Sequence, residues 1–181
     1  MLEEKVLIWQ FNHGRPEVLH DIYEKYKTDL LTLATALLSD LPAGEDVVHD
    51  VFISLLRSSG KIKLTGSLKG YLATCVVNAT RNVRRAQRRR PNVNLDQVKP
   101  IAGQSNRPDD AAVFHEQRSR LKQALVQLPC QQREALVLRI YGQMRFRDIA
   151  KQQGISATAA LYRYRHALDS LRSMLNSEVR R

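Results

Sequence analysis

One predicted helix carries a line of polar and cationic side chains along one face, and its C-terminal end is rich in arginine. Residues 70–90 read GYLATCVVNATRNVRRAQRRR, in which six of the last ten residues are arginine and none is acidic. Steps of four and three residues, which keep side chains on one helix face, connect Thr74, Asn78, Arg81, Arg85 and Arg88. Guanidinium groups bind phosphates, and side-chain amides bind base edges. The line is therefore a candidate surface for binding a nucleic acid.

The charge distribution supports this interpretation. The chain has 29 Lys+Arg and 18 Asp+Glu, a net charge of +11 and a pI near 10.1, and a domain pI above about 9 is typical of nucleic-acid binding. Residues 1–50 carry 4 basic and 10 acidic side chains, whereas residues 51–90 carry 10 basic ones and no acid. The basic stretch includes Lys61, Lys63 and Lys69, which flank the arginine line. An acidic front and a basic middle predict two different partner surfaces.

The acidic front contains a second candidate surface in the stretch EDVVHDVFISLL. Asp46 and Asp50 lie four residues apart beside Glu45, next to an apolar step at Phe52, and this pattern favours a docking surface for another protein. A metal site that includes His49 is the less favoured alternative. Carboxylate metal sites in helical bundles need a Glu-x-x-His pattern on two helices, and one imperfect copy is present. A plain solvated helix face remains a further alternative.

The C-terminal stretch FRDIAKQQGISATAALYRYRHALDSL has the layout of a helix-turn-helix. Gly154 can adopt the left-handed conformation that ends the first helix, and Ser156 can cap the second. In DNA-binding proteins the second helix of this motif enters the major groove. Its predicted outward residues suit that role: Thr158, Tyr162, Arg163, Arg165 and His166. The alternative is a simple helical hairpin with solvated arginines. This alternative does not explain why a glycine at the turn, a serine at the cap position and a basic exposed face occur together.

Helical periodicity predicts the elements that position these residues. A helix is expected over residues 16–40, followed by a turn at DLPAG, a helix over residues 45–58, a break at SSGKIKLTGS and a helix that begins near Ser67. The first helix should bury Leu19, Ile22, Tyr23, Tyr26, Leu30, Leu33, Ala34 and Leu37. The helix after Ser67 should bury Leu68, Tyr71, Leu72, Cys75, Val76, Ala79 and Val83.

The predicted fold is all-α, with two small helical domains joined by a flexible linker. Residues 1–90 form the first domain, and the first fifteen residues could be a helical turn or a flexible arm. Residues 91–111 contain several prolines and no sustained period, which is typical of a linker. Residues 112–181 form the second domain, which contains the helix-turn-helix.

The sequence shows no catalytic motif. It has neither a glycine-rich phosphate loop nor a G-x-S-x-G motif, so we expect no enzyme, no cofactor and no metal. Cys75 and Cys130 are too few for a disulfide framework and are expected as free thiols in a reducing compartment. Because no signal-peptide pattern and no apolar run of about 20 residues is present, the chain is expected to be cytoplasmic.

Three stretches carry a resemblance to a known family: EDVVHDVFISLL, GSLKGYLATCVVNATRNVRR and LPCQQREALVLRIYGQMRFRDIAKQQGIS. Together they resemble the two domains of the extracytoplasmic-function group of bacterial RNA polymerase sigma factors. The resemblance extends from about Leu19 to Leu175 and includes the order of the domains and the linker. It implies a dissociable subunit, monomeric when free, that binds core RNA polymerase and promoter DNA. It also implies an anti-sigma protein as a further partner, because the family is commonly held inactive by one.

The resemblance implies roles for individual residues. Polymerase docking falls on Asp46, Asp50 and Phe52. Opening and reading of the −10 promoter element fall on Asn78, Arg81, Asn82 and Arg85, with Asn78 at a position that holds a flipped base. Reading of the −35 element falls on the helix that contains Ser156, Arg163 and Arg165.

Two other classes of protein share parts of this pattern. A stand-alone DNA-binding regulator would use the helix-turn-helix alone and prefer duplex DNA. It would leave unexplained the arginine line and the acidic surface at Asp46 and Asp50, here called the acidic ridge. Such regulators also need a dimerisation element, and the sequence shows none. A non-specific RNA-binding protein would bind in a strongly salt-dependent way without sequence preference.

Overall fold

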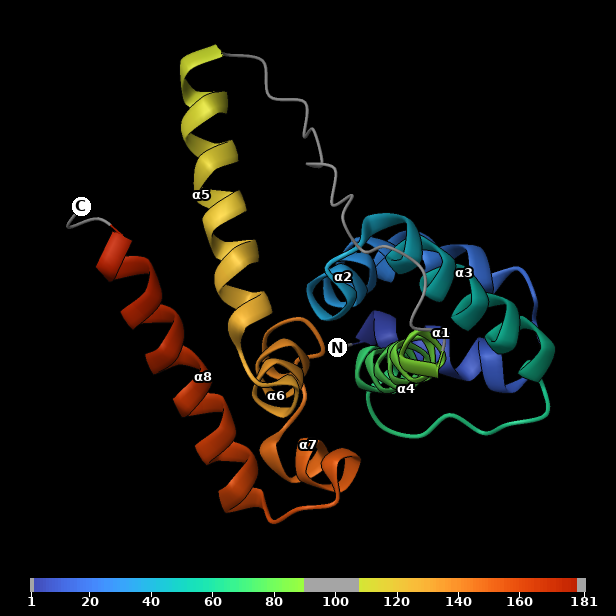
Figure 1. Ribbon diagram of the computed structural model, residues 1–181. Helices are drawn as coiled ribbons and strands as arrows, with labels where there is room; N and C mark the ends of the chain where they lie inside the picture. Colours follow the sequence, from blue (N-terminus) through green and yellow to red (C-terminus); the bar gives the residue numbers. More distant parts are fainter. Residues whose placement is uncertain (1, 90–107, 179–181) are drawn as a thin grey trace.

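The computed structural model describes residues 2–89 and 108–178, and within these ranges the chain is all-helical, as predicted (Figure 1). Four helices form the N-terminal half: α1 (Leu2–Asn12), α2 (Val18–Leu38), α3 (Leu41–Ser58) and α4 (Leu68–Arg89). Four more form the C-terminal half: α5 (Pro108–Gln127), α6 (Cys130–Ile140), α7 (Phe146–Gln153) and α8 (Ala157–Glu178). None of the described helices is both long and apolar enough to cross a membrane.

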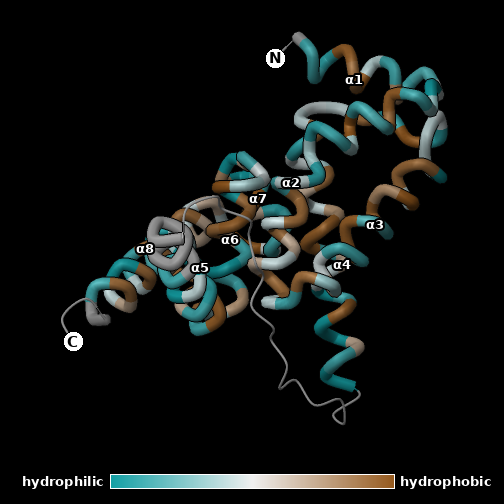
Figure 2. The backbone as a smooth tube through the Cα atoms, turned by 90° about the horizontal axis from the view of Figure 1, so that it is seen from above, coloured by the Kyte–Doolittle hydropathy of each residue, from teal (hydrophilic) through white to brown (hydrophobic). Residues whose placement is uncertain are grey.

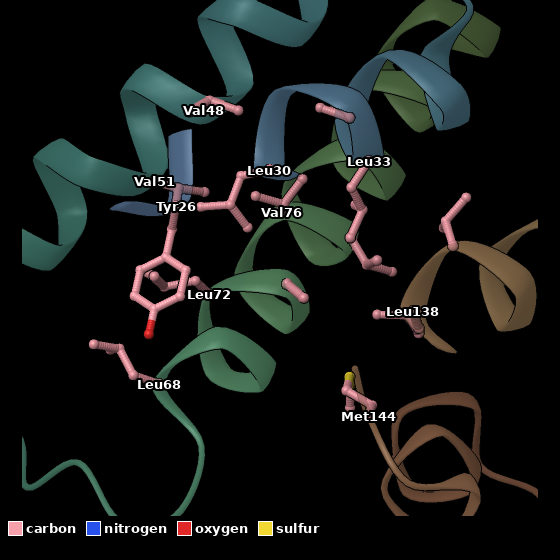
Figure 3. Packing of buried hydrophobic residues seen from close by; sticks show 14 of the residues in the cluster. Tyr26, Leu30, Leu33, Val48, Val51, Leu68, Leu72, Val76, Leu138 and Met144 are labelled. Carbon is pink, nitrogen blue, oxygen red and sulfur yellow. The ribbon is translucent and has the colours of Figure 1, made fainter. Parts of the chain in front are cut away.

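The core of the N-terminal half is built around α2, which packs on α1, α3 and α4. Figure 3 shows Leu30 and Leu33 of α2 beside Val76 of α4 and Val48 of α3. The predicted stripe of α2 is largely correct, because six of its members are fully buried: Ile22, Tyr26, Leu30, Leu33, Ala34 and Leu37. Tyr23 is an exception with 39% exposure.

Helix α1 fixes the point at which α4 begins, so the first residues form a helix and not a flexible arm. Phe11 is fully buried in the core. Asn12 exchanges two hydrogen bonds with the backbone of Leu64, at 3.0 and 2.7 Å. The carboxylate of Glu4 accepts hydrogen bonds from the backbone N–H of Leu68 at 2.8 Å and of Lys69 at 3.4 Å. A carboxylate at the start of a helix satisfies free N–H groups and interacts favourably with the helix dipole.

Replacing Glu4 by Ala should therefore lower the free energy of unfolding by about 1 kcal/mol, the usual cost of a lost helix cap. Urea unfolding followed by circular dichroism measures this loss. Glu3→Ala is the matched control, because the Glu3 side chain is 78% exposed and pairs with Lys25 at the surface, where ion pairs contribute little. Equal losses in the two variants would show that Glu4 does not cap α4.

The predicted turn at DLPAG is wrong, because α3 already begins at Leu41. Ser39 takes a left-handed conformation with a φ of 62°, and Asp40 caps α3 by accepting a hydrogen bond from the Ala43 N–H at 3.3 Å. The proline of DLPAG lies in the first helical turn, where its missing N–H costs nothing. A Cβ atom at Gly44 would approach the Thr35 hydroxyl to 2.9 Å, so this glycine lets α2 and α3 pack closely.

In the C-terminal half, α5, α6 and α7 all pack on α8. In Figure 1, α5 and α8 diverge as two long helices from the region of α6. A small apolar cluster joins the C-terminal end of α5, the middle of α8 and α6: Ala124, Leu128, Leu136, Ala167 and Leu171. Helix α5 begins at Pro108, inside the predicted linker of residues 91–111. The greater part of that predicted linker lies outside the described residues.

The two halves also pack on each other. Helix α6 contacts both α2 and α4, and in Figure 1 it lies between the first four helices and α8. Figure 3 shows Leu138 and Met144 beside the core of the first half. One hydrophobic cluster therefore extends across the boundary and includes the following residues of the C-terminal half: Ala135, Val137, Leu138, Met144, Ile149, Ala150 and Ala160.

This packing changes which residues of α4 are buried. Tyr71, Cys75, Ala79 and Val83, predicted as core, are half-buried, whereas Ala73, Val77 and Thr80 are fully buried. Ala73 faces the second half, because a Cβ atom at Gly142 would lie 3.0 Å from the Ala73 Cβ. Burial raises the pKa of Tyr71 to about 12 and raises the pKa of the Cys75 thiol.

Candidate nucleic-acid and polymerase surfaces

The arginine line occupies the solvent side of α4 beyond its buried first turns. Asn78, Asn82, Arg85 and Arg88 are exposed. Figure 2 shows the end of α4 as a hydrophilic segment that extends past the neighbouring helices. In this part of the helix, cationic and amide groups lie within reach of an extended polyanion. The C-terminal part of α4 is therefore an exposed surface of cationic and amide side chains.

The flanking lysines differ in their availability. Lys61 and Lys63 are exposed in the segment between α3 and α4. Lys69 forms an ion pair with Asp29 of α2, and its side chain is only 14% exposed. Two of the three predicted lysines are therefore free to meet a phosphate, while Lys69 holds α4 against α2.

Arg81 and Asn78, the central members of the line, contact the C-terminal half. The guanidinium of Arg81 donates to both carboxylate oxygens of Glu134 on α6, at 3.1 and 2.6 Å, and to the carbonyl of Gln152 on α7 at 3.4 Å. The Gln152 amide donates to Asn78 Oδ1 at 2.8 Å. The hydrogen bond that Arg81 donates to Glu134 raises the pKa of Arg81. One turn further, Arg84 contacts the Cys130 sulfur at 2.6 Å.

Arg133 ties helix ends from both halves together. Its side chain is buried and donates to the carbonyls of Leu37 at the end of α2 and of Val126 and Leu128 at the end of α5. Carbonyls at helix C-termini lack intrahelical partners and carry partial negative charge. Burial lowers the pKa of Arg133, and the neighbouring Arg84 adds to this effect.

The acidic ridge on α3 is open to solvent. Asp46 and Asp50 are exposed, and Phe52 is half-buried with its ring in edge-to-face contact with Tyr23, at 5.0 Å between centroids. A hollow of about 490 Å³ lies between α2 and α3, and Asp46, Tyr23 and His49 contribute to its lining. A partner that docks here meets negative charge beside aromatic and apolar surface.

The helix-turn-helix is formed as predicted by α7 and α8. Gly154 has a φ of 65°, and the Ser156 hydroxyl accepts a hydrogen bond from the Ala159 N–H at 3.1 Å. Thr158, Arg165 and His166 are exposed on α8, and Tyr162 is 65% exposed.

Arg163 is less free than its neighbours on α8. It is half-buried and donates to the Gln153 side chain of α7 at 2.9 Å. The residues predicted to read the −35 element thus lie on α8, except Ser156, which directly precedes it, and the bond to Gln153 holds the side chain of Arg163.

The sequence interpretation missed the residues that join the two halves. Glu134, Gln152, Arg84 and Arg133 were not singled out, because each binds a residue of the other half that lies between 46 and 96 positions away along the chain. One local signal was available for α6, where REALVLRI places adjacent charges at the head of an apolar run.

Comparisons with known proteins agree with the resemblance. The family model of sigma-70 region 2 matches residues 22–90, and that of sigma-70 region 4 matches residues 118–171. The RNA polymerase sigma factor CarQ of Myxococcus xanthus is 26% identical over 166 residues, which cover 92% of this chain and 94% of CarQ. The ECF RNA polymerase sigma factor SigW of Bacillus subtilis is 22% identical over 181 residues, covering 94% and 96% of the two chains.

Two solved structures share the fold. CnrH in complex with the cytosolic domain of CnrY has a TM-score of 0.69 at 18% identity and covers 96% of this chain and 97% of that one. The sigma factor RpoE in complex with the anti-sigma factor NepR, from Bartonella quintana, has a TM-score of 0.67 at 22% identity and covers 86% and 97%. The chain belongs to the extracytoplasmic-function group of the sigma-70 family and is an RNA polymerase sigma factor that directs transcription initiation to promoters.

Proposed function

We propose that two separate surfaces divide the work of this sigma factor: the acidic ridge on α3 docks on core RNA polymerase, and the arginine line on α4 opens and reads the −10 element. The main support for this proposal is that two neighbouring helices expose faces of opposite charge. Asp46 and Asp50 lie on the face of α3, and Arg85 and Arg88 lie on the face of α4. Complementary charge across an interface steers association and suppresses wrong partners. Because the acidic ridge and the arginine line carry opposite charges, they are expected to bind different partners.

On the α4 surface, the side chains divide by chemistry. Arg85 and Arg88, with Lys61 and Lys63, neutralise phosphates and release counterions, which supplies affinity without sequence preference. Asn78 and Asn82 offer amides that hydrogen-bond the edges of unpaired bases. Unstacking a base costs a few kcal/mol, and binding of the displaced strand on this face offsets that cost. Catalysis of RNA synthesis lies with the polymerase.

The helix-turn-helix contacts the −35 element through α8. Thr158, Tyr162, Arg165 and His166 form its exposed face, and an arginine on such a helix binds guanine edges or phosphates. Ser156 caps the N-terminal end of this helix, the end that we infer faces the DNA. We infer that the factor works in the cytoplasm with the polymerase. We also infer an anti-sigma partner, since the solved structure of RpoE is a complex with the anti-sigma factor NepR.

Substitution of Arg163 tests the −35 assignment. Arg163→Ala should weaken binding of the holoenzyme to duplex promoter DNA about tenfold, within the range of about 1–3 kcal/mol for a lost specific contact, and should relax the base preference at one position. Competitive binding to a randomised duplex pool measures both effects. Arg172→Ala is the matched control, because Arg172 lies exposed on the same helix and pairs with Asp169. If both variants keep wild-type affinity and preference, Arg163 does not read the −35 element.

A further inference from the structure

Two consecutive hydrogen bonds join α8 to α7 and α7 to α6 at the helix-turn-helix. The guanidinium of Arg163 on α8 donates from Nη1 to Oε1 of Gln153 on α7, at 2.9 Å. The Nε2 of Gln153 donates in turn to the Gln131 carbonyl on α6, also at 2.9 Å. Three helices are therefore connected through the side-chain amide of Gln153.

The two partners of the Gln153 amide leave it a single orientation. A guanidinium only donates hydrogen bonds, and a carbonyl only accepts them. The amide must therefore direct its oxygen to Arg163 and its nitrogen to Gln131. The backbone of Gln153 is constrained as well, because it is the last residue of α7 and Gly154, with a φ of 65°, ends that helix. The fold thus fixes the position of the oxygen that binds Arg163.

The bond to Gln153 leaves most of the Arg163 guanidinium available. Arginine has five N–H donors in a rigid planar fork, and within residues 2–89 and 108–178 no other group accepts a hydrogen bond from Arg163. The bond at Nη1 fixes the plane of the fork and leaves the donors at Nη2 and Nε. Two parallel donors in a fixed plane fit a guanine edge. Arg163 also lies in the N-terminal third of α8, the part of a recognition helix that contacts bases.

An arginine that is held before it meets DNA loses less conformational freedom on binding. Immobilising one long side chain at an interface weakens binding about three- to tenfold, and a binding side chain is placed most accurately when a second layer of hydrogen bonds locks its rotamer. Arg163 is half-buried against Gln153. Arg165, two residues further on the same helix, is exposed. The two arginines of α8 thus differ in how strongly the fold orders them.

We propose that Gln153 is a positioning residue for promoter recognition, which holds Arg163 in the orientation in which its remaining N–H groups read one base pair of the −35 element. This inference rests on the proposed role of α8. Gln153 acts through Arg163 and does not touch the DNA. Because its amide is anchored on the Gln131 carbonyl, the base preference of α8 also depends on α6, which lies outside the helix-turn-helix.

The first test compares affinity and base preference in the holoenzyme. Gln153→Met removes both hydrogen bonds and keeps a flexible, unbranched side chain. The holoenzyme should bind its selected duplex about three- to tenfold more weakly, and non-specific duplex within about twofold of wild type, because no charge is removed. The preference should be lost at the position that Arg163→Ala also relaxes. Competitive binding to a randomised duplex pool measures these effects.

A control and a double variant complete this test. Gln123→Met is the matched control, because Gln123 is an exposed glutamine on α5, and it should change neither affinity nor preference. Gln153→Met/Arg163→Ala should have the preference of Arg163→Ala alone, since Gln153 acts only through Arg163. Wild-type preference in Gln153→Met, or a loss spread over all positions, overturns the proposal. Tighter specific binding does so too, because the bond would then withhold Arg163 from the DNA.

The second test follows the Arg163 side chain directly and needs no substitution in α7. Nitrogen-15 relaxation of the arginine Nε groups is measured on the free full-length chain, and Arg163→Lys and Arg172→Lys assign the two signals by removing them. Arg163 should have a clearly higher order parameter than Arg172, whose side chain is 73% exposed on the same helix. Equal order parameters in the wild-type chain overturn the proposal.

The tests separate this inference from the function beneath it. If Arg163→Ala relaxes the base preference at no position, the proposed −35 role of Arg163 fails, and the positioning role fails with it. If Arg163→Ala relaxes one position and Gln153→Met does not, Arg163 reads the element and Gln153 does not position it.

Discussion

Reversing the charges of Asp46 and Asp50 together should weaken binding to core RNA polymerase at least about 100-fold, because like charges placed in an interface cost several kcal/mol. Both carboxylates are exposed on α3, where substitutions usually change folding stability by less than about 0.5 kcal/mol. The double variant Asp46→Arg/Asp50→Arg should therefore keep the wild-type circular dichroism spectrum and unfolding midpoint. A titration of fluorescently labelled chain with core polymerase measures the loss of affinity.

The control for this prediction is a second pair of exposed acids in the other half of the chain. Asp169→Arg/Glu116→Arg changes the net charge by the same amount on α8 and α5 and should leave polymerase affinity within about twofold, since exposed ion pairs contribute little. An unchanged affinity of the Asp46/Asp50 variant would mean that the ridge is a solvated face and that docking occurs elsewhere.

Removal of two arginines from the end of α4 should have the second large effect. In the double variant Arg85→Ala/Arg88→Ala, the holoenzyme should bind the −10 single strand about 10- to 100-fold more weakly at moderate salt, as expected for two lost phosphate contacts. Each phosphate contact on a single strand contributes about 0.7 to the slope of log K against log salt. The slope should therefore become shallower by about 1.4. Both residues are exposed, so the fold should be unaffected.

The salt dependence distinguishes phosphate contacts from a general effect of net charge. Arg118→Ala/Arg172→Ala removes two exposed arginines from α5 and α8 and should leave the slope for the single strand unchanged. If this control reduces the slope as much as the α4 variant does, the arginine line makes no specific contact with the strand.

Local signals in the sequence predicted the elements that local chemistry determines. The conformation of Gly154 and the capping hydrogen bond of Ser156 depend only on residues close by in the sequence. The turn and the cap of the helix-turn-helix could therefore be predicted from these residue types, and the structure confirms both. The same holds for the apolar stripe of α2, where periods of three and four residues identified most of the buried side chains. The DLPAG stretch was misinterpreted because proline favours a turn and the first turn of a helix alike.

Long-range packing could not be predicted in this way. A helix that packs on one partner buries one stripe, but α4 packs on α2, α3 and α6. Ala73 and Val77 are buried for that reason, although they lie outside the predicted stripe. The contact between Arg81 and Glu134 joins residues 53 positions apart, and no local pattern marks it. The candidate site was therefore predicted as a set of exposed residues, without the second half that covers part of it.

Promoter-directed transcription in vitro tests the central claim most directly. Core RNA polymerase is supplied with linear DNA templates that carry a randomised upstream region, and the transcripts made with and without this chain are sequenced. The account predicts start sites that depend on the chain and that share two upstream elements, and the Asp46→Arg/Asp50→Arg variant should produce none of them. Binding of the chain to duplex DNA without any chain-dependent start site would contradict the account, because the chain would then be a DNA-binding protein that does not direct initiation.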